Sequence, residues 1–230
     1  MDFLLKSATS AIKLIFEFDS SVYTVVWTSI RISLVAVTLA SVFSIPMGIL
    51  VALKSFPGKA LLLQTLNTLV ALPTVVVGLL LYGILSRQGP LGELGLLYTP
   101  AAMIIGQCVL VIPVIWSLAI SAALGADPRV SATCVALGAN SIQQGLLFFN
   151  EVRFSLLAAI VMGFGRAIGE VGIAMMLGGN IEGFTRTMTT AIALETSKGD
   201  FEFALALGLL LLLVAFFING LLQRFQYLNK

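Results

Sequence analysis

Arg166 and Glu170 are two residues of opposite charge in a stretch that is otherwise apolar enough to lie in lipid. They stand four positions apart, so on one helix they would share a face and could form an ion pair. Charged side chains are costly inside a membrane, where they fix helix packing or contact a transported ion. Because Glu170 would neutralise the charge that an anion needs, the spacing favours a structural pair over direct anion contact.

A second group of polar residues follows at 180–199, NIEGFTRTMTTAIALETSKG, which we call the polar segment. It is too short and too polar to span a bilayer alone, and it suits a re-entrant or outer-surface segment beside a water-filled cavity. Its neutral donors and the positive charge of Arg186 could pass a dianion without holding it. With Arg166 and Glu170, the candidate path residues are Asn180, Thr185, Arg186, Thr187 and Thr189, with Thr190 as a further donor. Each threonine could equally bond only to its own backbone.

The composition places these residues in an integral membrane protein. Of the 230 residues, 59% are hydrophobic and 10% are charged, which leaves too little polar surface for a soluble globule of this size. A net charge of +2 with scattered basic residues gives no nucleic-acid surface. The chain has no histidine, and neither cysteine belongs to a metal-binding pattern, so a hydrolase and a metal site are both disfavoured.

Five segments are long and apolar enough to cross a bilayer as helices, which takes about 20 residues each. They are residues 30–53, 60–86, 98–124, 154–178 and 201–224. Pro46, Pro73 and Pro113 lie inside three of them and predict kinks, since each removes a backbone hydrogen bond. The sequence therefore predicts an all-α protein with about five spans, forming a single domain over residues 1–230.

The ends of the chain predict its orientation. Residues 1–20 mix charged and apolar positions, which favours an N-terminal interfacial helix over a cleaved signal peptide. Six basic residues fall in the loops of one side and five in those of the other, where eight acidic residues also lie. This distribution places the carboxyl terminus in the cytoplasm and the amino terminus outside.

A long loop over residues 126–152 separates the third and fourth spans. Asp127 followed by Pro128 predicts a helix start, Gly138 a left-handed helix end, and Ser141 the cap of a second helix. Two short cytoplasmic helices should therefore meet near Gly138. A helix-turn-helix that merely lies on the membrane is the alternative.

The long loop resembles the EAA loop of permease subunits in ATP-binding-cassette importers. Leu137-Gly138-Ala139 matches the centre of that motif. Ala132-Thr133-Cys134 stands where Glu-Ala-Ala is expected, and Asn150-Glu151 replaces Leu-Pro. The resemblance implies that this loop contacts an ATPase subunit, through the residues Ala132, Leu137, Gly138, Ala139, Asn140 and Ser141.

Three further stretches resemble the oxyanion permeases for molybdate, tungstate and sulfate. They are LPTVVVG at 72–78, GRAIGEVG at 165–172 and GGNIEGFTRTMTTAI at 178–192. The ending TMTTAIALETSKGDF looks most like tungstate-specific members. The resemblance covers residues 25–225 and implies the type I importer permease fold and import of tungstate, or else of molybdate or sulfate, by alternating access.

No phosphate-binding loop of the G-x-x-x-x-G-K-[ST] type occurs, so this chain is expected to be no enzyme and to hold no cofactor. ATP would be bound by a partner ATPase, and an extracytoplasmic binding protein would deliver the anion. Five spans enclose too little volume for a path with two gates, which favours a homodimer with the path on its two-fold axis. The expected location is the lipid of a bacterial or archaeal cytoplasmic membrane. A secondary ion-coupled transporter without an ATPase, or a membrane assembly factor, is the alternative.

Overall fold

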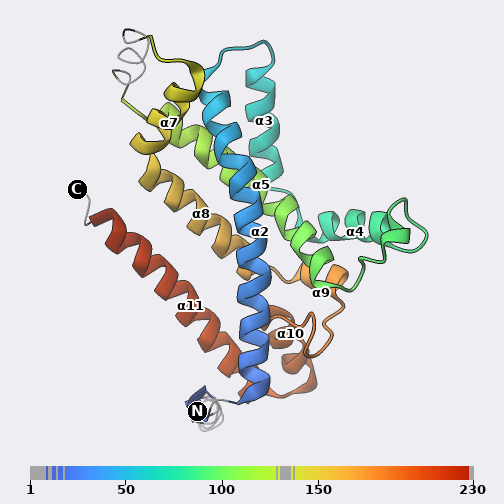
Figure 1. The fold of residues 1–230 in the computed structure, drawn as a ribbon. Helices are drawn as coiled ribbons and strands as arrows, with labels where there is room; N and C mark the ends of the chain where they lie inside the picture. The colour runs from blue at the N-terminus through green and yellow to red at the C-terminus, as the bar shows by residue number, and fades with distance from the viewer. Residues whose placement is uncertain are drawn as a thin grey trace.

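The computed structural model describes residues 9, 12, 13, 15–17, 19–127, 129, 136 and 138–227, and this part of the chain contains helices and no strand (Figure 1). The elements are α2 (Ser20–Leu53), α3 (Lys59–Val70), α4 (Thr74–Leu85), η1 (Gly92–Leu94), α5 (Pro100–Leu124), α7 (Ser141–Glu151), α8 (Arg153–Ile168), α9 (Gly172–Gly178), α10 (Met188–Lys198) and α11 (Phe201–Tyr227). The all-α prediction is confirmed.

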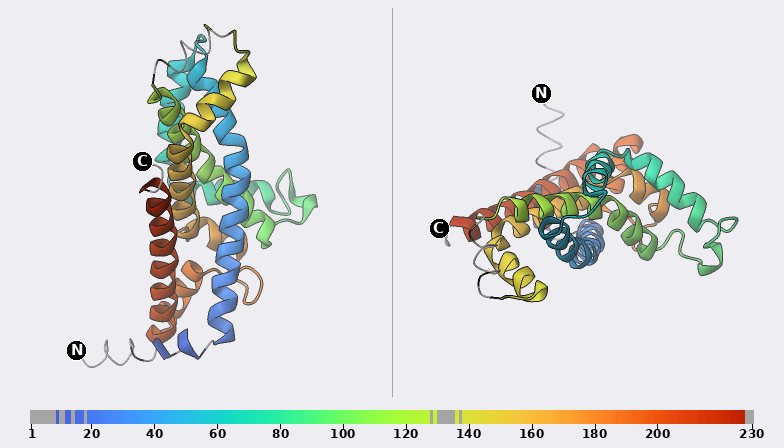
Figure 2. Two further views of the ribbon diagram at one scale, coloured as in Figure 1. Left: turned by 60° about the vertical axis from the view of Figure 1, so that its left-hand side comes forward. Right: turned by 90° about the horizontal axis from the view of Figure 1, so that it is seen from above.

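The longest helix, α2, runs the length of the molecule (Figures 1 and 2). Asp19 caps it, since its carboxylate accepts hydrogen bonds from the backbone N–H groups of Ser21 and Val22. The 34 residues of α2 rise about 51 Å, more than the ~30 Å hydrocarbon core of a bilayer. Pro46 lies inside this helix and Pro113 inside α5, and both helices continue past them.

Three helices of the described chain, Ser20–Leu53, Pro100–Leu124 and Phe201–Gly220, are long and apolar enough to cross a membrane, and the number rises to five if each of two bent pairs is one span. One pair is α3 with α4, which meet at 97°. The kink predicted at Pro73 within the span 60–86 is therefore confirmed, and it is a sharp bend. The break falls at Pro73, which lacks an N–H and stands in extended backbone as the N-cap of α4.

The predicted span 154–178 is also broken. The helix α8 ends at Ile168, and Gly169, Glu170 and Val171 separate it from the short α9. Glycine weakens a helix, and the Glu170 carboxylate accepts a hydrogen bond from the N–H of Ile173, which starts the next helix instead of continuing the first. At its other end α8 meets α7 at 74°, and these two form the second bent pair.

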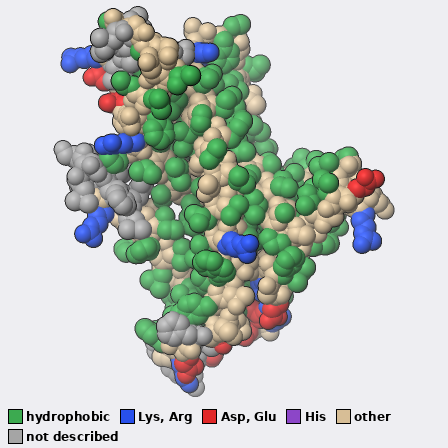
Figure 3. Space-filling model, in the orientation of Figure 1, with side chains coloured by type: hydrophobic (Ala, Val, Ile, Leu, Met, Phe, Trp, Pro, Cys, Tyr) green, Lys and Arg blue, Asp and Glu red, His purple; other side chains and the backbone are tan. Residues whose placement is uncertain are grey.

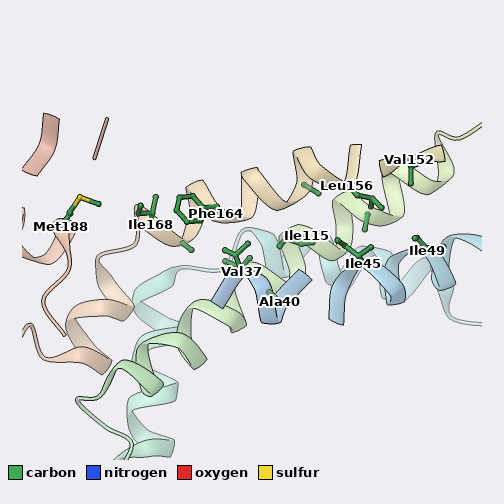
Figure 4. Packing of buried hydrophobic residues seen from close by; sticks show 14 of the residues in the cluster. Val37, Ala40, Ile45, Ile49, Ile115, Val152, Leu156, Phe164, Ile168 and Met188 are labelled. Carbon is green, nitrogen blue, oxygen red and sulfur yellow. The ribbon is translucent and has the colours of Figure 1, made fainter. Parts of the chain in front are cut away.

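The main core lies where α2, α5, α8 and α11 meet. Figure 4 shows its side chains, among them Ile45, Ile115, Leu156 and Phe164. Close approach depends on glycine: a Cβ on Gly48 would stand 2.6 Å from the Cβ of Ala119. Small residues at helix contacts are typical of membrane proteins, in which packing rather than water exclusion holds helices together. On the face drawn in Figure 3, hydrophobic side chains are spread over the whole body, and most charged side chains lie at its ends or on the lateral projection.

The two ends of the molecule carry different elements (Figure 1). The start of α2 lies at the same end as α10, whereas α7 and the start of α3 lie at the other end. This separation agrees with the prediction that the polar segment and the long loop are on opposite sides of a membrane. The predicted interfacial helix over residues 1–20 falls mostly outside the described residues.

One part of the chain leaves this body sideways. After the 97° turn, α4 and the following residues 86–98 project laterally at a level between the two ends of α2, in two different views (Figures 1 and 2). The α4 helix is anchored by α9, since a Cβ on Gly78 would meet the sulfur of Met176 at 2.8 Å.

Candidate anion path and coupling loop

Arg166 and Glu170 do not form the expected ion pair. Arg166 lies in the last turn of α8 and is exposed, whereas Glu170 follows the end of that helix and is only 6% exposed. The Glu170 Oε1 atom accepts a hydrogen bond from the Ile173 N–H at 3.2 Å. Among the described residues no ion pair joins the two, because the break at Gly169 removes the common helix face that the prediction assumed.

Buried threonine hydroxyls form hydrogen bonds that hold the polar segment together. Thr187 caps α10 and forms a reciprocal capping box with Thr190. The Thr189 hydroxyl donates to the Glu170 carbonyl at 2.7 Å, which ties α10 to the break after α8. These three side chains are buried, and each hydroxyl has at least one hydrogen-bond partner within the chain.

Thr185 closes the turn that leads into α10. It is fully buried, its hydroxyl donates to the Gly178 carbonyl at 2.6 Å, and the same oxygen accepts from the Ile181 N–H at 3.0 Å. Gly179 and Asn180 stand within this turn with positive φ angles of 68° and 52°. A left-handed asparagine is uncommon, and two such residues in succession reverse the chain after α9.

Two predicted path residues carry buried polar atoms without a partner in the described structure: the Asn180 Oδ1 atom and the Arg186 Nε atom. The Arg186 guanidinium is paired at its other end with Glu182, at 3.3 Å. A buried polar atom is normally satisfied by protein, water or a ligand. Of the predicted path residues in the polar segment, these two therefore retain hydrogen-bonding capacity.

Arg186 borders a cavity of about 410 Å³ at the end of the molecule where α2 begins. Lys198 adds a second cation, held 3.0 Å from Glu195. Three carboxylates also line the cavity, those of Glu182, Glu195 and Asp200. The described lining residues carry three acidic and two basic groups, so together they offer no net attraction to a dianion.

In the long loop, the described residues begin again at Gly138, apart from Arg129 and Ala136. Gly138 has a φ of 69°, so the predicted left-handed position is confirmed. The cap of α7 is Asn140 and not Ser141, which is already helical: Asn140 and Gln143 exchange two hydrogen bonds of 2.9 Å. An extended asparagine can reach the N–H three residues ahead, which a residue inside the helix cannot do. Ala132 and Leu137 lie outside the described residues.

The α7 helix presents a row of exposed apolar side chains. Ile142 is 75% and Leu146 61% exposed, while Phe148 on the other face is buried. Positions 142 and 146 are one helical turn apart, so they form a stripe at the end of the molecule opposite to the polar segment. Exposed apolar stripes of this kind mark contact surfaces for protein or lipid.

Two features of the site had no signal in the sequence. The Ser29 hydroxyl on α2 accepts from the Met188 N–H at the start of α10, and the hydroxyls of Tyr82 and Tyr98 lie 3.4 Å apart. Each joins residues that no local pattern connects. Such pairs become visible only when the helices are packed.

The long apolar helices and the two bent helix pairs are those of a multi-pass membrane protein. The chain belongs to the family of oxyanion permeases of ATP-binding-cassette importers. It is 40% identical over 226 residues to the tungstate uptake system permease protein of Peptoclostridium acidaminophilum, covering 98% of this chain and 99% of that one. It is 34% identical to the permease of the same description in Campylobacter jejuni, over 98% of this chain and 95% of that one.

A more distant relative is the sulfate transport system permease protein CysW of Escherichia coli K12. It is 28% identical over 89% of this chain and 74% of its own length. No protein-family model matches the chain. The similarity to permeases over nearly the whole length confirms the predicted family and places the chain among transport subunits.

Proposed function

We propose that this chain is the permease subunit of an ATP-driven importer and that its substrate is tungstate. The observation that carries the proposal is the sequence identity of 40% and 34% to two tungstate uptake permeases, each over 98% of this chain. The identity to a sulfate permease is lower, at 28%. The chain contributes the membrane path and does not hydrolyse ATP, in keeping with the absence of a phosphate-binding loop. The membrane is the cytoplasmic membrane of a bacterium or archaeon.

The partner ATPase docks on the end formed by α7. The exposed stripe of Ile142 and Leu146 supplies an apolar contact, and the left-handed Gly138 with the Asn140 cap fixes the direction in which α7 leaves the loop. A rigid, capped helix can transmit a movement of the ATPase to α8, which it meets at 74°. The coupling residues of this surface are Gly138, Ala139, Asn140 and Ser141, with Ala132 and Leu137 outside the described part.

A homodimer is supported by the lateral projection of α4. Its exposed apolar residues include Val75, Leu79 and Leu80. The segment 86–98 that follows, which contains Arg87 and Glu93, runs at a level between the ends of α2 (Figure 1). Charged groups at that depth are costly in lipid and are placed toward water or protein. A second copy that packs against α4 would enclose these charges around a water-filled path on the two-fold axis.

The binding protein docks at the opposite end, beside the cavity of about 410 Å³. Mixed charges on Arg186, Glu182 and Lys198 suit pairing with charged side chains of a partner better than retention of a free dianion. The predicted path residues stay part of this proposal: Arg166, Glu170, Asn180, Thr185, Arg186, Thr187 and Thr189. Arg186 and Asn180 contribute their unsatisfied atoms, and the buried threonines and Glu170 hold the turn in place.

Reconstitution tests the proposal. The permease is placed in proteoliposomes with the ATPase and binding protein encoded with it, and tungsten inside the vesicles is measured by mass spectrometry. Uptake that requires ATP and both partners is expected. Equal uptake without the ATPase, driven by a proton or sodium gradient, would instead identify a secondary transporter. Uptake of sulfate or molybdate in preference to tungstate, with the same complex, would refute the substrate assignment alone.

A further inference from the structure

A polar cavity different from the one beside Arg186 lies at the end of α4, away from the predicted path residues. Its volume is about 620 Å³, and its lining includes Tyr82, Ser86, Arg87, Gln88 and Tyr98. We call it the tyrosine cavity. None of its lining residues is an aspartate or glutamate. Its side chains therefore offer hydroxyl, amide and guanidinium donors and one positive charge, unlike the cavity beside Arg186, which three carboxylates line.

The hydroxyls of Tyr82 and Tyr98 form the centre of this arrangement. Their oxygens are 3.4 Å apart, and the rings meet edge to face with centroids 6.4 Å apart. Each hydroxyl has one proton, so one proton is used between the two oxygens and the other is free to be donated to a ligand. A tetrahedral oxyanion has only acceptor oxygens. It is thus a suitable partner for this second proton.

The position of Tyr98 is fixed at a cost in backbone energy. Its φ is 64°, a region that bulky residues rarely occupy, and its N–H donates to the Leu177 carbonyl at 2.8 Å. Gly179 makes room for the ring, because a Cβ there would stand 2.7 Å from the Cδ1 atom of Tyr98. Strained residues held by their surroundings are found preferentially at functional sites.

The tyrosine pair also borders a second cavity of about 600 Å³. This one reaches Met175, Gly179 and Ile181. Ile181 belongs to the turn that Thr185 closes, so the second cavity connects the tyrosine pair with the polar segment. The two tyrosines therefore lie between the polar segment and the tyrosine cavity.

Arg87 is exposed in the single chain and makes no ion pair with any described residue. It follows α4, whose lateral course holds residues 86–98 between the two ends of α2 (Figures 1 and 2). An unpaired guanidinium at that depth needs water or an anion, because lipid would solvate neither its charge nor its five N–H donors.

We propose that the tyrosine cavity is a contact site for the transported oxyanion, with Arg87 supplying the charge and Tyr82 and Tyr98 the neutral donors. This inference rests on the proposed function. The anion passes from the polar segment to the tyrosine pair and accepts the hydroxyl proton that the bond between the two tyrosines leaves free. The site holds it weakly enough to release it, since one cation faces a dianion.

The test uses the complete complex in proteoliposomes, with tungstate as the probe. Tyr98→Phe, Tyr82→Phe and Arg87→Gln are compared with Arg224→Gln, an exposed arginine in the last turn of α11. Loss of one hydrogen bond to a charged group should lower the tungstate uptake rate about tenfold or more. The number of ATP molecules hydrolysed per tungstate imported should rise by a similar factor, and Arg87→Lys should restore part of the uptake.

Each outcome bears on the inference separately from the proposed function. If the parent complex imports no tungstate, the proposed function fails first. If the parent imports and the three variants import at the same rate, the tyrosine cavity is not on the path. If uptake and ATP hydrolysis fall in the same proportion, so that their ratio is unchanged, the three residues serve structure or assembly, and the inference is wrong.

Discussion

Ser29 and Met188 are 159 positions apart and share a hydrogen bond of 2.7 Å, from the Met188 N–H to the Ser29 hydroxyl. Both residues are buried. Met188 is the first residue of α10. The N–H groups at the start of a helix have no carbonyl partner within that helix. The Ser29 side chain of α2 therefore gives the first N–H group of α10 its hydrogen-bond partner. This bond fixes the distance between α2 and the start of α10.

Replacement of Ser29 by alanine should destabilise the protein by about 1–3 kcal/mol, because the Met188 N–H would be buried without a partner. The measurement is thermal unfolding of the purified chain in detergent. Thr28→Ala is the matched control, since among the described residues the Thr28 hydroxyl bonds only to the Thr24 carbonyl of its own helix. Equal stability of the two variants would show that water replaces the Ser29 hydroxyl.

Arg166 and Glu170 should behave as independent residues. Glu170→Leu should lower stability, because the Ile173 N–H would lose its acceptor, whereas Glu170→Gln retains an acceptor oxygen and should cost less. In a double-mutant cycle with Arg166→Met, the effects on folded yield and stability should add to within about 0.5 kcal/mol. A larger coupling energy would restore the ion pair that the sequence predicted.

Gly138→Val should leave membrane insertion intact but weaken ATPase docking. A Cβ at this position meets no atom of the described residues within 4 Å, so the cost is backbone strain at a φ of 69°, about 1–2 kcal/mol. Relief of that strain would tilt α7. The readout is a crosslink from a cysteine placed at Ser141 to the ATPase, together with tungstate uptake. Gly208→Val, in the open interior of α11, is the control and should dock normally.

Asn140→Ala should loosen the start of α7 by about 1 kcal/mol, since the capping box with Gln143 would be lost. Asn140→Asp keeps the acceptor oxygen and should retain docking. Binding of the ATPase to the permease in detergent, measured by calorimetry, separates the two variants. Identical affinities would mean that docking holds α7 without help from its cap.

The sequence by itself determined the parts of this protein that depend on neighbours in the chain. Long apolar runs specify α2, α5 and α11, because any such run must satisfy its backbone as a helix in lipid. The left-handed Gly138 was likewise predictable, since only glycine takes that conformation freely after a helix. The family was predictable too, from the motifs at residues 72–78, 165–172 and 178–192, as the tungstate permease relatives confirm.

Tertiary structure decided which partner each polar side chain takes. Glu170 could pair with Arg166 on a continuous helix or cap a new one, and the packing of α9 between α4 and α5 accompanies the second choice. Thr185, Thr187 and Thr189 are buried although most of the turn after α9 is exposed, and each hydroxyl forms its hydrogen bonds within the chain. Tyr82 meets Tyr98 because α4 packs against α9, while the Tyr98 N–H is bonded to the Leu177 carbonyl of α9. A local pattern fixes which groups need hydrogen bonds, whereas the burial that leaves them a single partner depends on helices distant in sequence.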